Sequence, residues 1–212
     1  HFPYAEHALG EAELVQIIDY VRAHPEVNEV ILSGGDPLMA KDEQLAALLQ
    51  ALGELPQLRR LRLHTRLPIT IPSRITETLV DLLAAAPWPT IVVFHTNHAR
   101  EIDESVAEAV AKLRAVGVTL FNQSVLLRGV NDSAAALIQL SERLFEVGVL
   151  PYYVHLLDRV AGAAHFEVPE ARRQELARAL LRELPGFLVP RWVREVGGQA
   201  SKVPIDLRLD LR

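Results

Sequence analysis

Thr90-Ile91-Val92-Val93-Phe94-His95-Thr96-Asn97-His98 is the stretch from which the fold can be worked out. A run of β-branched and aromatic residues of this length is typical of a buried strand. The strand predicted over residues 90–95 ends in polar side chains, at the point where the chain leaves the sheet. Outward from it, apolar residues at helical spacing predict a helix over 102–116, with Gly117 as its stop, and then a strand over 118–123. The stretch therefore belongs to a repeated strand–helix unit.

The same alternation extends along the rest of the chain. Helices are predicted over 11–23, 42–52, 74–86, 133–147 and 169–184, and strands over 28–33, 58–64, 150–156 and 187–193. Units at intervals of very roughly 30 residues favour parallel strands with right-handed crossovers. A doubly wound sheet concentrates its site at one switch point, whereas a (β/α) barrel builds it from the ends of many strands. Polar residues end almost every predicted strand, so we predict an α/β fold, a partial TIM-like (β/α) barrel formed by residues 1–212 as one domain.

The composition excludes several classes of function. The 212 residues are half hydrophobic, and a net charge of −5 without a long basic run predicts no nucleic-acid surface. No stretch is apolar enough to span a membrane, so we expect a soluble, cytoplasmic protein. The chain contains no cysteine, which excludes disulfides, zinc–thiolate sites and an iron–sulfur cluster held by its own residues.

One lysine stands apart from the other two. Lys41 and Lys112 lie in helical, solvent-facing patterns, but Lys202 follows Gly197 and Gly198 in a loop between apolar segments. Desolvation there could make it a nucleophile towards an aldehyde, and a surface turn with a solvated lysine is the alternative.

Two further motifs follow predicted strands. Ser33-Gly34-Gly35-Asp36-Pro37 combines glycines that free backbone groups for a charged ligand with a carboxylate; a tight turn with a capping aspartate explains the same residues. His95 and His98 have metal-like spacing, but no carboxylate or third histidine completes a zinc site, which leaves contact with a small ligand or strand-end packing. We expect Asn131 and Asp132 to cap the helix that follows them.

Together these motifs resemble the lysine 2,3-aminomutase family of radical S-adenosylmethionine (SAM) enzymes, and in particular its elongation factor P branch. The resemblance runs in family order over nearly the whole chain, and it rests on His1-Phe-Pro-Tyr4, Leu32-Ser-Gly-Gly-Asp-Pro-Leu38, His64-Thr-Arg-Leu-Pro68, His95-Thr-Asn-His98, 122–132 (Asn-Gln-Ser-Val-Leu-Leu-Arg-Gly-Val-Asn-Asp), Pro151-Tyr-Tyr153, Asp158, Ala164-His-Phe166 and 197–204.

The resemblance implies an isomerase that converts L-lysine to (R)-β-lysine for the modification of elongation factor P. Its cofactors would be pyridoxal 5′-phosphate (PLP), SAM and a [4Fe–4S] cluster. Lys202 falls on the lysine that holds PLP, and Asp158 and Glu195 fall on carboxylates for the side-chain ammonium of the substrate. The positions near SAM are Gly34, Gly35, Asp36, His95, Asn97 and Gln123. A salt bridge to Arg159 or Arg194 is the alternative for the two carboxylates.

The sequence departs from the family at its start and at one carboxylate. The CxxxCxxC loop that holds the cluster would lie just before His1, so we expect a polypeptide cut after that motif and inert by itself. Glu195 stands where the free-lysine enzymes have aspartate. An aminomutase for another amino acid, a non-radical PLP enzyme and a cofactor-free binding module remain as alternatives.

Overall fold

The computed structural model describes residues 11–158 and 162–205, in which seven strands form one sheet in the order β1-β2-β3-β4-β5-β6-β7. The first six strands are parallel, and β7 pairs antiparallel with β6. The strands are β1 (Glu29–Leu32), β2 (Arg60–Thr65), β3 (Thr90–His95), β4 (Thr119–Val125), β5 (Leu150–His155), β6 (Arg191–Arg194) and β7 (Val203–Pro204). The longer helices are α1 (Glu11–Ala23), α2 (Asp42–Gly53), α4 (Glu77–Ala84), α5 (Glu104–Ala115), α6 (Ala134–Val147) and α7 (Glu170–Glu183).

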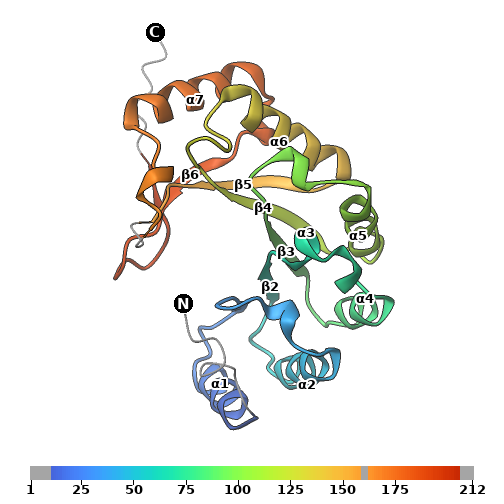
Figure 1. Cartoon of the computed structure of the whole chain (residues 1–212). Coiled ribbons are helices and arrows are strands. Elements are labelled where there is room, and N and C mark those ends of the chain that lie inside the picture. The colour runs from blue at the N-terminus through green and yellow to red at the C-terminus, as the bar shows by residue number, and fades with distance from the viewer. Residues whose placement is uncertain (1–10, 159–161, 206–212) are drawn as a thin grey trace.

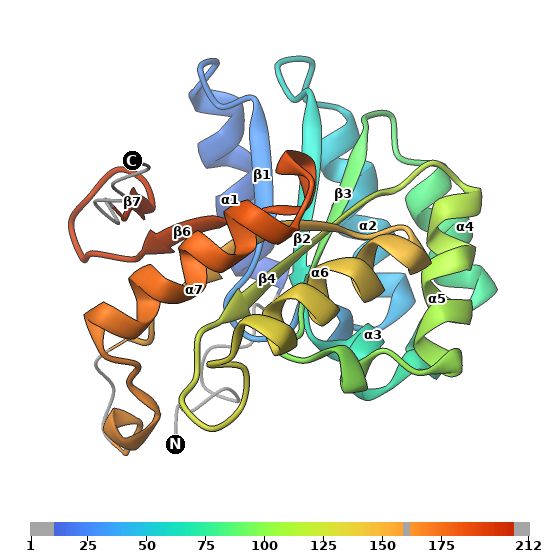
Figure 2. The ribbon, with the colours of Figure 1, turned by 90° about the horizontal axis from the view of Figure 1, so that it is seen from above.

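The sheet curls into a half-barrel with the helices on its convex side (Figure 1). Figure 2, from above, shows α6 and α7 in front of the strands, α4 and α5 beside them and α2 behind them. Alternate strand residues such as Leu63, Val92 and Phe94 pack against these helices in a buried apolar layer. A second apolar group, which includes Leu180 and Trp192, lies under α6 and α7. The partial (β/α) barrel predicted from the sequence is thereby confirmed.

The repeat is regular over the first five strands, which begin at residues 29, 60, 90, 119 and 150. Local capping explains where the helices start. The hydroxyl of Ser133 accepts a hydrogen bond from Ala136 N (3.2 Å) at the start of α6 and Asp103 accepts one from Val106 N (3.0 Å) at the start of α5. The expectation that Asn131 and Asp132 cap α6 is therefore wrong. None of the helices in the described residues is both long and apolar enough to cross a membrane.

Most predicted boundaries lie within two residues of the observed ones, and two elements differ by more. The helix predicted over 74–86 begins only at Glu77, because Pro72–Arg74 forms a 3₁₀ turn and Thr76 caps α4 by accepting from Leu79 N at 3.2 Å. The last strand was predicted over 187–193, but Gly186–Leu188 is a second 3₁₀ turn and the strand runs over Arg191–Arg194. The sequence analysis found neither the short helix α3 (Leu67–Thr70) nor β7.

Candidate functional site

The carboxyl ends of four neighbouring strands carry a row of polar side chains on the concave face. We call His64, His95, Gln123 and His155 the histidine row; they come from β2, β3, β4 and β5. In each strand these residues alternate with side chains packed on the helices, so they face the open side of the half-barrel. The strand register places His95 beside Gln123. The amide nitrogen of Gln123 lies 3.0 Å from His95 Nε2. The same His95 Nε2 lies 3.5 Å from His64 Nδ1.

The imidazoles of the row are uncharged at neutral pH. Burial lowers the pKa of His64 to about 4, helped by the charges of His95 and Arg62. Burial also lowers the pKa of His155 to about 4, with the charge of Lys202 as the next cause. The pKa of His95 is likewise lowered, chiefly by burial.

Three buried polar atoms of the row have no hydrogen-bond partner among residues 11–158 and 162–205: Nε2 of His64, Nε2 of His155 and Oε1 of Gln123. Buried polar groups nearly always have a hydrogen-bond partner, so these three atoms need an explanation. Because they lie on the concave face, a bound polar ligand would satisfy them. The row is thus suited to hold an uncharged or cationic molecule through hydrogen bonds.

Asp36 joins the turn after β1 to the turn after β2. Its Oδ1 accepts from Leu38 N (3.0 Å) and the Thr65 hydroxyl (2.6 Å). Its Oδ2 accepts from Arg66 N (2.6 Å) and Leu67 N (3.1 Å). The preceding Gly34 and Gly35 both have positive φ, of 80° and 69°, which only glycine adopts freely. The carboxylate is therefore occupied inside the protein, and a ligand at this turn would meet chiefly the backbone.

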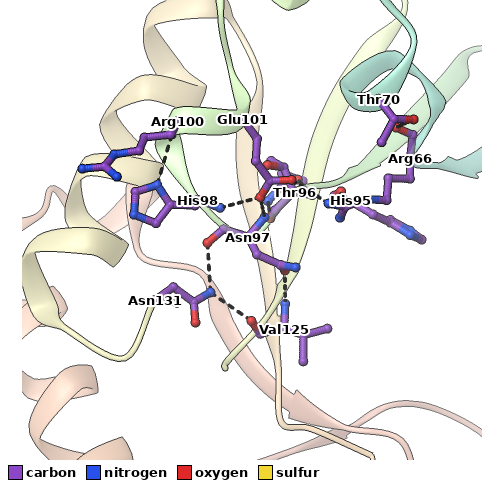
Figure 3. A network of polar contacts seen from close by, with 11 residues as sticks. Arg66, Thr70, His95, Thr96, Asn97, His98, Arg100, Glu101, Val125 and Asn131 are labelled. Atoms are coloured by element: carbon purple, nitrogen blue, oxygen red, sulfur yellow. Dashed lines mark hydrogen bonds and ion pairs between the residues drawn. The ribbon is translucent and has the colours of Figure 1, made fainter. Parts of the chain in front are cut away.

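The loop after β3 is held by a network that the sequence analysis did not anticipate (Figure 3). Glu101 accepts from the backbone nitrogens of Asn97 (2.7 Å) and His98 (2.9 Å) and pairs with Arg66 at 2.7 Å. Fully buried Asn131 donates to the carbonyls of Asn97 and Val125, both at 2.9 Å. The network fixes the loop in place beside the strand that carries His95.

Two of the residues predicted as ligand contacts have structural roles in this network. The side-chain oxygen of Asn97 accepts from Val125 N at 2.8 Å, and His98 Nδ1 accepts from Arg100 N at 3.1 Å. His98 therefore caps the turn that follows it. Whether Asn97 also contacts a ligand stays a prediction.

A hairpin between β6 and β7 forms the second part of the site. Asp158, Glu195 and Lys202 line a cavity of about 560 Å³ together with the loop residues Val196, Gly197, Gly198, Gln199 and Ser201. Gln199 N donates to Val196 O at 3.1 Å and Gly198 has a φ of 81°, the arrangement of a type II turn. The sequence prediction that Asp158, Glu195 and Lys202 share one site is consistent with this cavity.

Glu195 and Lys202 form an ion pair across the mouth of this hairpin. The Lys202 side chain is 23% exposed and that of Glu195 56% exposed. The hydrogen bond from Lys202 lowers the pKa of Glu195 below its usual range. The alternative partner Arg194 is thus not the one that Glu195 takes; Arg159, like the motif His1-Phe-Pro-Tyr4, lies outside the described residues.

His64 and His155 are the site residues that sequence reasoning missed. Both stand at polar strand ends, and His64 also opens the motif His64-Thr-Arg-Leu-Pro68, but neither was assigned to the site because a single strand-end histidine is an ordinary feature. Their position beside His95 and Lys202 depends on the strand register and the curl of the sheet. The signal available in the sequence was the recurrence of histidine at the ends of three predicted strands.

Comparison with known proteins gives a consistent set of relatives. No family model matches the sequence. The chain is 54% identical over 209 residues to an L-lysine 2,3-aminomutase of Escherichia coli, covering 99% of this chain and 61% of the relative. It is 50% identical over 202 residues to one of Haemophilus influenzae (95% and 60%) and 38% identical over 188 residues to one of Clostridium subterminale (89% and 45%). The chain thus spans at most about three-fifths of the length of these relatives.

Solved structures share the fold of this chain. Streptococcus suis SuiB bound to S-adenosylmethionine aligns with a TM-score of 0.60 and 14% identity, over 86% of this chain and 43% of that chain. A radical SAM methyltransferase from Sphaerobacter thermophilus aligns with a TM-score of 0.56 and 20% identity, over 87% and 57%. At these identities the likeness concerns the fold alone.

Proposed function

We propose that the chain belongs to the lysine 2,3-aminomutase family and that its protein is an isomerase that converts L-lysine to (R)-β-lysine. The relatives are named for that activity and match nearly the whole chain. The observation that carries the proposal is the cavity in which Lys202 lies with two carboxylates, Asp158 and Glu195. A carbonyl cofactor and an ammonium-bearing substrate would both find their chemical partners there.

The cavity residues fit PLP. Lys202 supplies the primary amine that holds this cofactor covalently. Gly197, Gly198 and Ser201 line the same cavity and would offer backbone N–H groups and a hydroxyl to a phosphate. A left-handed Gly198 lets the backbone approach such a group closely, and no atom lies within 4 Å of the place where a Cβ would be.

The histidine row fits SAM. Its neutral imidazoles do not repel a sulfonium cation, and its unpartnered atoms can bond the hydroxyl and amino groups of a nucleoside. We assign His95 and Gln123 to that role, with His64 and His155 beside them. A [4Fe–4S] cluster does not fit the residues present, because it needs thiolates and the chain has no cysteine. The cluster is therefore assigned no residue of this chain.

In the proposed reaction this chain binds and orients the reactants. When bound, SAM would supply the radical chemistry if it received one electron from a cluster held outside these residues, and PLP would supply the electron delocalisation that the shift of an amino group needs. Asp158 and Glu195 would bind the side-chain ammonium of lysine and so fix how far its α-carbon lies from Lys202. Two carboxylates also repel an acidic side chain, which favours lysine over acidic amino acids.

We also propose that the product serves the β-lysylation of elongation factor P. Support comes from the sequence motifs, which resemble the elongation factor P branch of the family. Deleting the gene and weighing elongation factor P by mass spectrometry tests this: loss of the β-lysyl mass is expected, and an unchanged mass would contradict it.

The assignment of Lys202 is tested by chemical trapping. The full-length protein is incubated with PLP, reduced with borohydride and digested, and the pyridoxyl group is located by peptide mapping. We expect it on Lys202, and we expect Lys202→Met to remove it. Lys112→Met is the matched control, because Lys112 also pairs with a glutamate, Glu77, at 2.8 Å but far from the cavity. A stoichiometric adduct on Lys41 or Lys112 would refute the assignment.

A further inference from the structure

The ion pair between Glu195 and Lys202 follows from the hairpin register. Val193 pairs with Pro204 and Arg194 pairs with Val203 across β6 and β7. In an antiparallel ladder the next residues outward are again opposite each other, and these are Glu195 and Lys202. Opposed residues have Cβ atoms about 4.5–5.5 Å apart, so their side chains meet. The spacing of the glutamate and the lysine in the sequence therefore builds the pair into the fold.

Lys202 pairs with a carboxylate that an ammonium ligand in the same cavity could also bind. Glu195 and Asp158 line the cavity together, and within the described residues Lys202 is the cation that pairs with Glu195. His155 and His64, which also act on Glu195, are neutral at pH 7 because of their lowered pKa values. An incoming ammonium group would therefore compete with the ammonium of Lys202 for the same oxygen atoms.

We propose that Glu195 is a shared carboxylate: the free ammonium of Lys202 occupies it, and a ligand ammonium reaches it only when Lys202 is engaged elsewhere. Lys202 then stands in for the side-chain ammonium of the substrate. When its nitrogen bonds to the carbonyl carbon of an aldehyde, with release of one water, the ammonium group with its three N–H donors is replaced by an imine that keeps at most one. The inference rests on the proposed function, since it makes cofactor attachment at Lys202 the event that opens the ammonium site.

The size of the effect follows from competition. If the ion pair occupies Glu195 for nine-tenths of the time, the apparent affinity for an ammonium ligand falls about tenfold. Removing the ammonium of Lys202 should therefore raise the apparent affinity about tenfold. A purely structural ion pair predicts no such gain.

The experiment measures binding without any cofactor. The full-length protein, freed of PLP, is titrated with n-pentylamine at pH 7, where this amine is a monovalent ammonium, and the dissociation constant is measured by calorimetry. Lys202→Met should bind pentylamine about tenfold more tightly than the wild type. The double variant Glu195→Gln/Lys202→Met should lose that gain, and Lys112→Met should bind as the wild type does.

Equal affinity in the wild type and Lys202→Met, or a gain that persists in the double variant, would overturn the proposal. Lys202→Arg keeps the cation and should match the wild type. Should Lys202→Met fail to fold by circular dichroism, Lys202→Gln carries the same expectation. Because no PLP is present, failure here leaves the trapping experiment at Lys202 untouched, and failure of trapping leaves this result untouched.

Discussion

Replacing Asp36 with alanine should destabilise the protein more than the loss of an ordinary helix cap. Its carboxylate accepts four hydrogen bonds of 2.6–3.1 Å from the turns after β1 and β2. Bonds to a charged group contribute about 1.5–3 kcal/mol each, but water would reach part of the freed donors. Thr65 is buried, at 1% exposure, so the hydrogen of its hydroxyl would be left without an acceptor. We expect Asp36→Ala to lower the free energy of unfolding by about 3–5 kcal/mol.

The assay is urea unfolding of the full-length protein, monitored by circular dichroism and extrapolated linearly to water. Asp103→Ala is the matched control, because Asp103 is also a capping aspartate but bonds only within its own turn, to Val106 N and the Ser105 hydroxyl. Its loss should cost about 1 kcal/mol. If Asp36→Ala loses no more than Asp103→Ala, the four bonds do not hold the two turns together. A result in which Asp36→Ala keeps full stability but no longer binds SAM would instead make Asp36 a direct ligand contact.

Three further outcomes are expected. Because the folded pKa of His64 and His155 lies near 4, below the ordinary 6.5, the unfolded state binds more protons, so the free energy of unfolding falls by roughly 2 kcal/mol per histidine between pH 7 and pH 4.5. His64→Leu should lessen that slope in urea unfolding, and an unchanged slope would place the titration elsewhere. Asn131→Ala leaves three backbone groups without their hydrogen-bond partner and should lower the free energy of unfolding by about 2–4 kcal/mol in the same assay. A loss below about 1 kcal/mol would show that the loop is held without Asn131. Asp158→Asn should lower kcat/KM for lysine at least about tenfold with PLP binding retained; normal turnover would place the ammonium site elsewhere.

The order of elements could be predicted because each strand and helix has a distinct apolar period. Their boundaries could not, since apolar side chains report burial and not backbone hydrogen bonding. Leu58 was placed in a strand, yet its nitrogen donates to Leu55 O in a turn and its side chain is buried. Phe187 was placed in the last strand, yet it lies in a 3₁₀ turn after Pro185 with 60% of its surface exposed.

Several side chains of the candidate site could be singled out in the sequence, but their arrangement could not. Lys202 and Glu195 both stood out in the sequence, but their ion pair depends on β7, a strand of two residues that is too short to leave a pattern. Asp36 was recognised as a strand-end carboxylate that could cap its turn. Its reach to Thr65, 29 residues away, depends on β1 and β2 being neighbours in the sheet.

The unbroken strand order has a consequence for how the protein is made. Each parallel strand from β2 to β6 pairs with the strand that precedes it in the chain. A newly synthesised strand thus finds its docking edge already exposed on the nascent chain, and the loop closed at each step stays short. The half-barrel can grow from the ribosome one unit at a time, with Lys202 and Glu195 joined after the histidine row is complete.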